Sequence, residues 1–288
     1  MINQDLKNSL VLLRFPFSLF LLPPFFFAWS QATKIDHDNL FLVFIILHVL
    51  VYPASNGYNS YMDRDTGSIG GIEHPPLPNR GLFFLTLVMD VVSIVLSLFV
   101  NWYFTIGLLV YVLCSRAYSY RGIRLKQYPF IGFFTVFLVQ GAITFYMIFK
   151  GISADTQAVP PWQCMLASSL LIGALYPLTQ IYQHEQDKLD GVESISYKLG
   201  YRGSFIFSGI LFALANILLY FYFTENGSLI SFFIFSIALL PAVAYFFYWA
   251  IQVFKQPTAA NFKNSLLMNV IAAFCTNTGF ILLIILKH

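Results

Sequence analysis

Residues 52–67 read YPASNGYNSYMDRDTG, and residues 176–191, which begin 124 positions later, read YPLTQIYQHEQDKLDG. Each stretch follows an apolar segment and opens with Tyr-Pro. Both then have an amide residue at the fifth and eighth positions, Asp at the twelfth and Gly at the sixteenth. The chain therefore contains an internal repeat, and the polar residues that the two copies share predict a functional site.

The repeat places an amide and a carboxylate near each other in both halves of the chain. Asn59 and Asp63 are four residues apart, as are Gln183 and Asp187, so on a helix each pair lies on one face. Oxygen atoms of carboxylates and amides are suitable ligands for hard cations, and Mg²⁺ commonly binds one or two carboxylates together with phosphate oxygens. Two such helices facing each other are therefore expected to hold Mg²⁺ ions and the phosphate groups that these ions bind.

The composition is that of a membrane protein. Hydrophobic residues are 58% of the 288 residues and charged residues only 10%, which is too little charge to cover a soluble globule of this size. Nine apolar runs each approach the roughly 20 residues that a membrane-spanning helix needs. They are Leu10–Ser30, Asn39–Tyr58, Gly81–Val100, Trp102–Tyr118, Pro129–Phe149, Pro161–Tyr182, Gly203–Phe223, Leu229–Ile251 and Ser265–Leu286. We therefore expect an all-α, polytopic membrane protein.

Lysine and arginine are distributed unequally between the two sides of the predicted membrane domain. If the N-terminus is cytoplasmic, only Lys34, Lys150 and Lys287 of the 16 basic residues lie on the far side, and the other 13 lie on the cytoplasmic side. This bias follows the positive-inside rule. We therefore expect a multi-pass protein of the cell membrane with both repeats facing the cytoplasm. Topology explains the pI of about 8.6, and no nucleic-acid partner is expected.

Three motifs follow one another along the chain on the predicted cytoplasmic side. They are the segment from Asn59 to Asp65, the segment YSYRGIRLK at 118–126, and the segment from Gln183 to Gly200. The first and last resemble the two aspartate-rich motifs of the UbiA superfamily of membrane prenyltransferases, and the middle one resembles that family's Tyr-Ser-rich loop ending in Leu-Lys. Spacing, span count and sidedness agree over the entire chain, so the resemblance is global.

The resemblance implies nine transmembrane helices around a central cavity, in one domain over residues 1–288 with two pseudo-repeated halves of about 1–150 and 151–288. It implies a prenyltransferase, which transfers alkyl groups other than methyl, in which Mg²⁺ assists ionisation of an isoprenyl diphosphate. The prenyl group then passes to a hydrophobic acceptor, aromatic or lipid. We expect the cavity between the second and sixth helices, open to membrane lipid so that an apolar chain can enter without crossing water.

The candidate site residues fall into three groups. Asp63 and Asp187 are the expected catalytic residues, because metal-bound carboxylates stabilise the charge that develops on a leaving diphosphate. The expected metal ligands are Asn59, Asp63, Asp65, Gln183, Glu185 and Asp187. The residues expected to bind the diphosphate, since Lys, Arg and amide groups donate hydrogen bonds to phosphate oxygens, are Lys126, Arg64, Arg121, Arg124, Arg14 and Asn56.

Both aspartate-rich motifs carry less negative charge than the family pattern. Ser60 and Gly67 stand where Asp is usual in the first motif, and Gln183 replaces the first Asp of the second. Neutral amide oxygens bind Mg²⁺ less strongly than carboxylates do. Asp65 can join Asp63 only if the helix ends between them, which the glycines that follow favour.

Two other functions remain open. In a membrane terpene cyclase on the same scaffold, the ionised prenyl chain would attack its own double bond. A non-catalytic carrier or assembly protein would have lost its metals. For single residues, Asp63 and Asp187 could instead be charged groups that end their spans, and the basic residues could serve only to determine topology.

Overall fold

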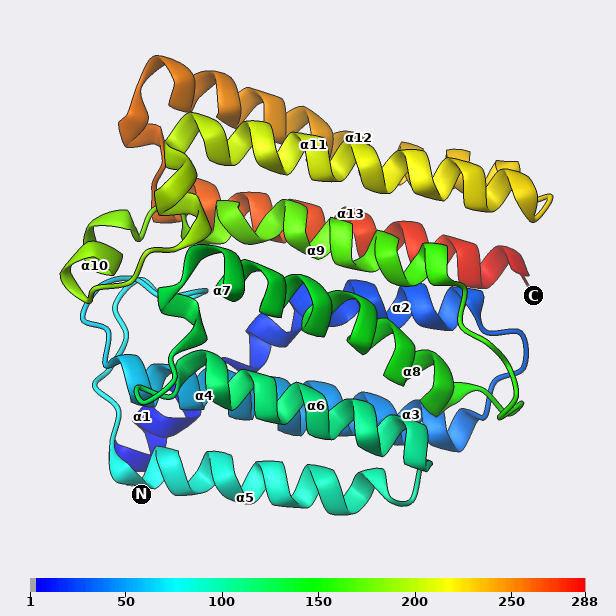
Figure 1. The fold of residues 1–288 in the computed structure, drawn as a ribbon, viewed down its shortest axis with the longest axis horizontal. Helices are drawn as coiled ribbons and strands as arrows, with labels where there is room; N and C mark the ends of the chain where they lie inside the picture. The colour runs from blue at the N-terminus through cyan, green and yellow to red at the C-terminus, as the bar shows by residue number, and fades with distance from the viewer. Residues whose placement is uncertain (1–3, 288) are drawn as a thin grey trace.

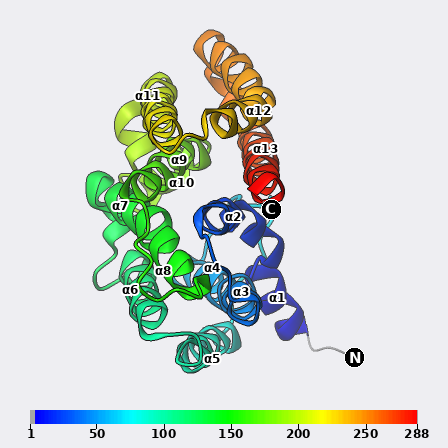
Figure 2. The same cartoon turned by 90° about the vertical axis from the view of Figure 1, so that its right-hand side faces the viewer.

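The computed structural model describes residues 4–287, and in this range the regular secondary structure is helical apart from two isolated β-bridges. Its long helices form nine rods that run nearly parallel, as the two views show (Figures 1 and 2). In chain order the rods are α1 (Gln4–Leu12) with η1 (Phe15–Leu21) and α2 (Leu22–Gln31); α3 (His37–Ile45) with η2 (Ile46–Val51) and α4 (Tyr52–Asp63); α5 (Arg80–Ser97); α6 (Trp102–Ser119); α7 (Pro129–Val136) with η4 (Phe137–Ile143) and α8 (Thr144–Ile152); α9 (Trp162–Gln180); α11 (Ile195–Glu225); α12 (Leu229–Lys255); and α13 (Phe262–Lys287). The short helices η3 (Leu125–Gln127), α10 (His184–Leu189) and η5 (Pro257–Ala259) lie in the connections.

The all-α prediction is confirmed, and each of the nine apolar runs corresponds to one rod. Seven rods in the described part of the chain are long and apolar enough to cross a membrane, as is typical of a multi-pass membrane protein. The other two, α6 and α9, carry polar residues such as Tyr118 and Gln180, which line an internal cavity. The expected count of nine spans is therefore approximate, because these two rods share their surface between lipid and a polar interior.

The fifth rod contains a π-helical segment, η4, that packs closely on α9. A π-helical turn alters the usual backbone hydrogen bonding, and here the amide of Ala142 donates to the hydroxyl of Ser169 on α9 (2.9 Å). The hydroxyl of Ser168 donates to the carbonyl of Gly141 (3.3 Å). A Cβ at Gly141 would lie only 2.3 Å from the Cα of Ser169. These contacts fix η4 against α9 and thereby position its neighbouring residue, Gln140.

Both repeats lie at the end of the molecule where α1 begins, and α13 ends at the opposite end (Figure 1). Helix α4 ends at Asp63, and Arg64 follows in the left-handed region (φ 54°), so the expected helix end before Asp65 is confirmed. The second repeat differs from the single helix expected, because α9 ends at Gln180 and α10 begins at His184. This break allows α10 to leave the axis of α9.

Candidate functional site

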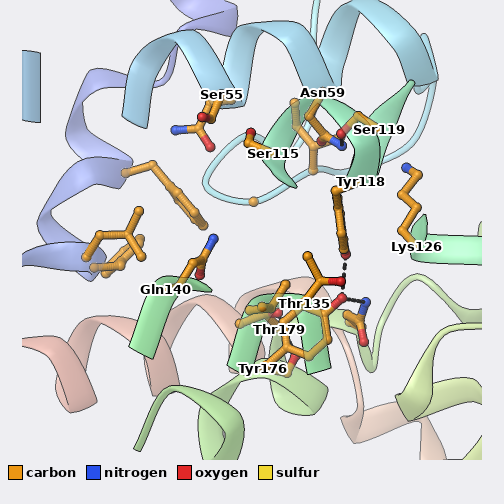
Figure 3. Close-up of a pocket in the computed structure, with 18 of the residues that line it drawn as sticks. Ser55, Asn59, Ser115, Tyr118, Ser119, Lys126, Thr135, Gln140, Tyr176 and Thr179 are labelled. Carbon is orange, nitrogen blue, oxygen red and sulfur yellow. Dashed lines mark hydrogen bonds between the residues drawn. The ribbon is translucent and has the colours of Figure 1, made fainter. Parts of the chain in front are cut away.

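A cavity of about 290 Å³ lies between the rods and reaches the end that carries the repeats. Its walls include α4 and α9, the second and sixth rods, so the predicted cavity between these helices is confirmed. Eight of the twelve candidate residues line it: Arg14, Asn56, Asn59, Asp63, Asp65, Lys126, Gln183 and Asp187. Farther inside, the lining consists of aromatic and aliphatic side chains with neutral polar groups between them, several of which Figure 3 labels.

Asp63 is the centre of the wall formed by the first repeat. Its carboxylate is buried and accepts a hydrogen bond from Asn59 Nδ2 (2.9 Å), one turn earlier on α4. The same Asn59 nitrogen donates to the Ser119 hydroxyl on α6 (3.0 Å). Lys126, in the loop after α6, forms an ion pair with Asp63. The first motif and the middle motif, residues 118–126, therefore meet at this carboxylate.

Two arginines of the middle motif, residues 118–126, support this wall from behind. Arg121 donates from Nε to the carbonyl of Met62 (2.6 Å) and from Nη2 to the carbonyl of Asp63 (3.2 Å), which satisfies carbonyl groups that the end of a helix leaves free. Arg124 forms an ion pair with Asp190, and its Nη2 lies 3.6 Å from Asp63 Oδ1. Both arginines hold the end of α4, and neither lines the cavity.

The loop after α4 connects the two repeats across the cavity mouth. Gln183 Nε2 donates to the carbonyl of Ser68 (3.1 Å), and Gln186 Nε2 donates to Asp65 Oδ1 (2.9 Å). These bonds direct α10 toward the loop after α4, which explains why the second repeat does not continue the line of α9. Asp65 and Asp187 thus face one cavity from its two sides.

The carboxyls of Asp65 and Asp187 are held in partly dehydrated positions. Burial raises the pKa of Asp65 to about 6, and the nearby carboxylate of Asp63 adds to the rise. Burial also raises the pKa of Asp187 to about 6, although a hydrogen bond from Ser194 opposes it. A cation bound between them would favour their ionised forms and offset the cost of keeping these charges away from water.

Arg14 approaches the cavity from the first rod. Its guanidinium donates to the carbonyls of Gly70 (3.3 Å) and Asn56 (3.1 Å) and lies 5.4 Å from the ring centroid of Phe17. Its Nε and the Asn56 Nδ2 are buried and have no hydrogen-bond partner. These donors are available to an anion in the cavity.

Four candidate residues lie outside the cavity lining. Glu185 is exposed on α10, and Arg64 is exposed with its guanidinium 5.8 Å from the ring centroid of Tyr61. Arg121 and Arg124 are the supporting residues described above. Glu185 and Arg64 became candidates because they are close in sequence to Asp187 and Asp63. Closeness in sequence does not show whether a side chain points into the cavity or away from it.

The donor atoms at the cavity mouth fit Mg²⁺ bound together with a phosphate. Within residues 4–287, no three His, Cys, Asp or Glu side chains lie close enough to form a metal site by themselves. Mg²⁺ rarely uses such an all-protein site and keeps water and phosphate oxygens among its ligands. Asp63 Oδ1 is buried without a hydrogen-bond partner, and it lies in the same cavity as Asp65 and Asp187.

Sequence reasoning missed a contact between the two walls. The hydroxyls of Tyr118 on α6 and Tyr176 on α9 are hydrogen-bonded to each other (Figure 3), and Gln180 Nε2 donates to the Tyr176 hydroxyl (3.0 Å). Both tyrosines stand in segments that the sequence singled out, Tyr176 at the start of the second repeat and Tyr118 at the start of the segment 118–126, but nothing in the sequence indicated that their hydroxyls meet.

A model of the UbiA prenyltransferase family matches residues 20–275. Curated proteins gave no match. Among solved structures, the chain is similar to a UbiA homolog from Archaeoglobus fulgidus bound to GPP and Mg²⁺, with a TM-score of 0.71 and 18% identity over 96% of this chain and 99% of that chain. It is also similar to the apo structure of a UbiA homolog from Aeropyrum pernix K1, with a TM-score of 0.68 and 17% identity over 93% of this chain and 98% of that chain. A structure of digeranylgeranylglyceryl phosphate synthase has a TM-score of 0.62 and 22% identity, covering 97% of this chain and 99% of that chain.

Proposed function

This chain belongs to the UbiA prenyltransferase family, and we propose that it transfers the prenyl group of an isoprenyl diphosphate to a hydrophobic acceptor inside the membrane. The observation that carries the proposal is the meeting of Asp63, Asp65, Asp187 and Lys126 in one cavity. Carboxylates and a cation gathered in partly buried positions are costly unless a bound ligand or metal compensates their charges. The Archaeoglobus homolog, which binds GPP with Mg²⁺, supports a diphosphate as the ligand.

The cavity mouth provides ligands for Mg²⁺ from both repeats. The residues proposed to hold it are Asn59, Asp63, Asp65, Gln183 and Asp187. When bound, Mg²⁺ neutralises negative charge on the diphosphate. Lys126 and Arg14 are proposed to donate hydrogen bonds to the remaining phosphate oxygens, while Arg121 and Arg124 keep the end of α4 in place.

The proposed reaction is a substitution at C1 of the prenyl chain. The C1–O bond breaks, and its electron pair leaves with the diphosphate. The acceptor donates an electron pair to C1, forms the new bond and loses one proton to water. The aromatic rings that line the cavity, among them Phe17, Phe20 and Tyr118, would exclude water from the allylic cation and offer it π-electron density.

The product of the reaction separates this function from its alternatives. Purified protein is incubated with geranyl, farnesyl or geranylgeranyl diphosphate and a set of phenolic acceptors, with and without Mg²⁺, and the products are identified by mass spectrometry. We expect prenylated acceptor and free diphosphate only when Mg²⁺ is present. Hydrocarbon formed without acceptor would indicate a cyclase, and no diphosphate release with any chain length would indicate a non-catalytic carrier.

We propose that the cavity mouth faces the cytoplasm at the cell membrane. The mouth lies at the end that carries 13 of the 16 basic residues, and the positive-inside rule places this end in the cytoplasm. A topology reporter fused after Gln256, in the connection between α12 and α13, should report the cytoplasmic side. A reporter fused after His288, which lies outside the described residues, should report the far side, and a cytoplasmic signal there would refute the orientation.

A further inference from the structure

Two serines form a layer in the cavity one helical turn below the acidic mouth. Ser55 precedes Asn59 by four residues on α4, and Ser115 precedes Ser119 by four residues on α6. Asn59 and Ser119 are hydrogen-bonded to each other (3.0 Å), so the two serines lie at a common depth about 5.4 Å farther in. Both line the cavity, and Figure 3 shows them on the same wall.

The hydroxyls of these serines differ from those of the two threonines that line the cavity. Thr135 donates to the carbonyl of Ile131 and Thr179 to that of Tyr176, each at 2.7 Å, which is the usual way for a hydroxyl on a helix to be satisfied. Ser55 and Ser115 make no hydrogen bond to any residue in the described range. Two hydroxyls in the cavity are therefore free to bind a ligand.

Gln140 adds an amide to the same region from the fifth rod. It lies in the π-helical segment η4, which the contacts with Ser168 and Ser169 fix against α9. Its side chain lines the cavity, points inward in Figure 3 and shares a hydrogen bond with Tyr111. A primary amide can form up to four hydrogen bonds, so most of the capacity of Gln140 remains for a ligand.

We propose that Ser55, Ser115 and Gln140 form the subsite for the prenyl acceptor, and that the acceptor is an uncharged ring with hydroxyl or carbonyl groups, such as a hydroquinone. This inference rests on the proposed function. The prenyl tail offers no hydrogen bond, so it would leave both serine hydroxyls and most of the hydrogen-bonding capacity of Gln140 unpaired. The tail fits better against the apolar part of the lining that Phe17, Phe20 and Leu21 provide.

The depth of the serine layer matches the chemistry. An acceptor atom must lie within about 3.5 Å of C1, and C1 is bonded to the diphosphate until it leaves. A diphosphate held at the Asn59 level therefore places the attacking atom near the next turn inward, where Ser55 and Ser115 lie.

The charge of the acceptor follows from the groups around the subsite. The charged residues found in the lining, Arg14, Lys126, Asp63, Asp65 and Asp187, belong to the mouth. Arg14, whose guanidinium donates to the carbonyls of Gly70 and Asn56, is one of the residues proposed above to bind the diphosphate, so it would not be free for a second anion. A carboxylate on the acceptor would thus have to enter the subsite without a partner, which is unfavourable at this depth.

Binding of two acceptors of matched size tests the proposal. The probes are methylhydroquinone and 4-hydroxybenzoate, each measured by equilibrium binding to purified protein in the presence of Mg²⁺ and the unreactive analogue geranyl S-thiolodiphosphate, and again without them. The variants are Gln140→Leu and the double variant Ser55→Ala/Ser115→Ala, which removes only hydroxyls without partners and should fold normally. Gln157→Leu, in an exposed loop at the far end, is the matched control.

We expect methylhydroquinone to bind more tightly than 4-hydroxybenzoate, and both variants to weaken its binding about tenfold, as the loss of hydrogen bonds to a buried ligand predicts. Binding of geranyl diphosphate should not change in any of the variants. Tighter binding of 4-hydroxybenzoate, or variants that weaken geranyl diphosphate instead, would overturn the subsite. Failure of the proposed function would look different, because wild-type protein would then form no prenylated acceptor from any of the phenols in the product assay, whichever of the two probes binds more tightly.

Discussion

Asp63→Asn and Asp187→Asn are each expected to lower the rate of prenyl transfer at least about a hundredfold, because stabilisation of a developing negative charge commonly contributes ~3–4 kcal/mol. Each substitution removes one anionic metal ligand and keeps the size of the side chain. Asp63 and Asp187 occupy the same position in the two repeats and line the same cavity, so both losses should be large. Turnover is measured at several Mg²⁺ concentrations, and thermal unfolding confirms that each variant is folded.

Glu185→Gln is the matched control for Asp187→Asn. Glu185 lies two residues earlier on α10, carries the same charge and is exposed outside the cavity. We expect it to change turnover far less. Near-normal turnover of folded Asp187→Asn protein at limiting Mg²⁺ would contradict a catalytic role for the aspartates that the two repeats share. Equal impairment of Glu185→Gln would contradict it as well.

Lys126→Met should weaken binding of the prenyl diphosphate about 10- to 100-fold, since a hydrogen bond between charged groups contributes ~1.5–3 kcal/mol. The side chain of Lys126 lines the cavity and is ion-paired with Asp63, so it can reach a phosphate oxygen bound beside that carboxylate. Excess Mg²⁺ should not restore binding, because the metal does not replace the lost hydrogen-bond donor. Equilibrium binding of radiolabelled geranyl diphosphate over a range of Mg²⁺ concentrations measures this.

The control for Lys126→Met is Lys188→Met, which removes an exposed lysine of α10 near the same mouth. It should leave binding unchanged. Full recovery of Lys126→Met at high Mg²⁺ would mean that the lysine acts only by adjusting the charge of Asp63. Since Asp63 is buried, the stability of Lys126→Met must also be compared with that of the parent protein.

The spans and the position of the cavity could be predicted from the sequence because both depend on strong signals. Apolar runs of membrane length determine the rods, and the repeated Asn59–Asp63 and Gln183–Asp187 pairs indicate which rods face each other. The end of α4 before Asp65 was also predictable, because the glycines that follow favour a loop.

The direction of individual side chains at the mouth could not be predicted. Glu185 and Arg64 are close in sequence to the acidic positions but point outward, because α10 turns toward the loop after α4 and Arg64 adopts a left-handed backbone. These turns depend on tertiary contacts such as Gln186 with Asp65 (2.9 Å). The inward direction of Gln140 could not be predicted either, because it depends on the packing of the π-helical segment η4 against α9.

Protection of Cys114 from alkylation tests the central claim most directly. Cys114 lines the cavity, whereas Cys164 and Cys275 are buried outside it and serve as internal controls. Purified protein is treated with a membrane-permeant maleimide, and mass spectrometry follows the modification of each cysteine. We predict that geranyl diphosphate together with Mg²⁺ protects Cys114, that neither protects it alone, and that Asp187→Asn abolishes the protection. Modification of Cys114 at an unchanged rate in wild-type protein with both ligands present would contradict binding of a prenyl diphosphate in this cavity.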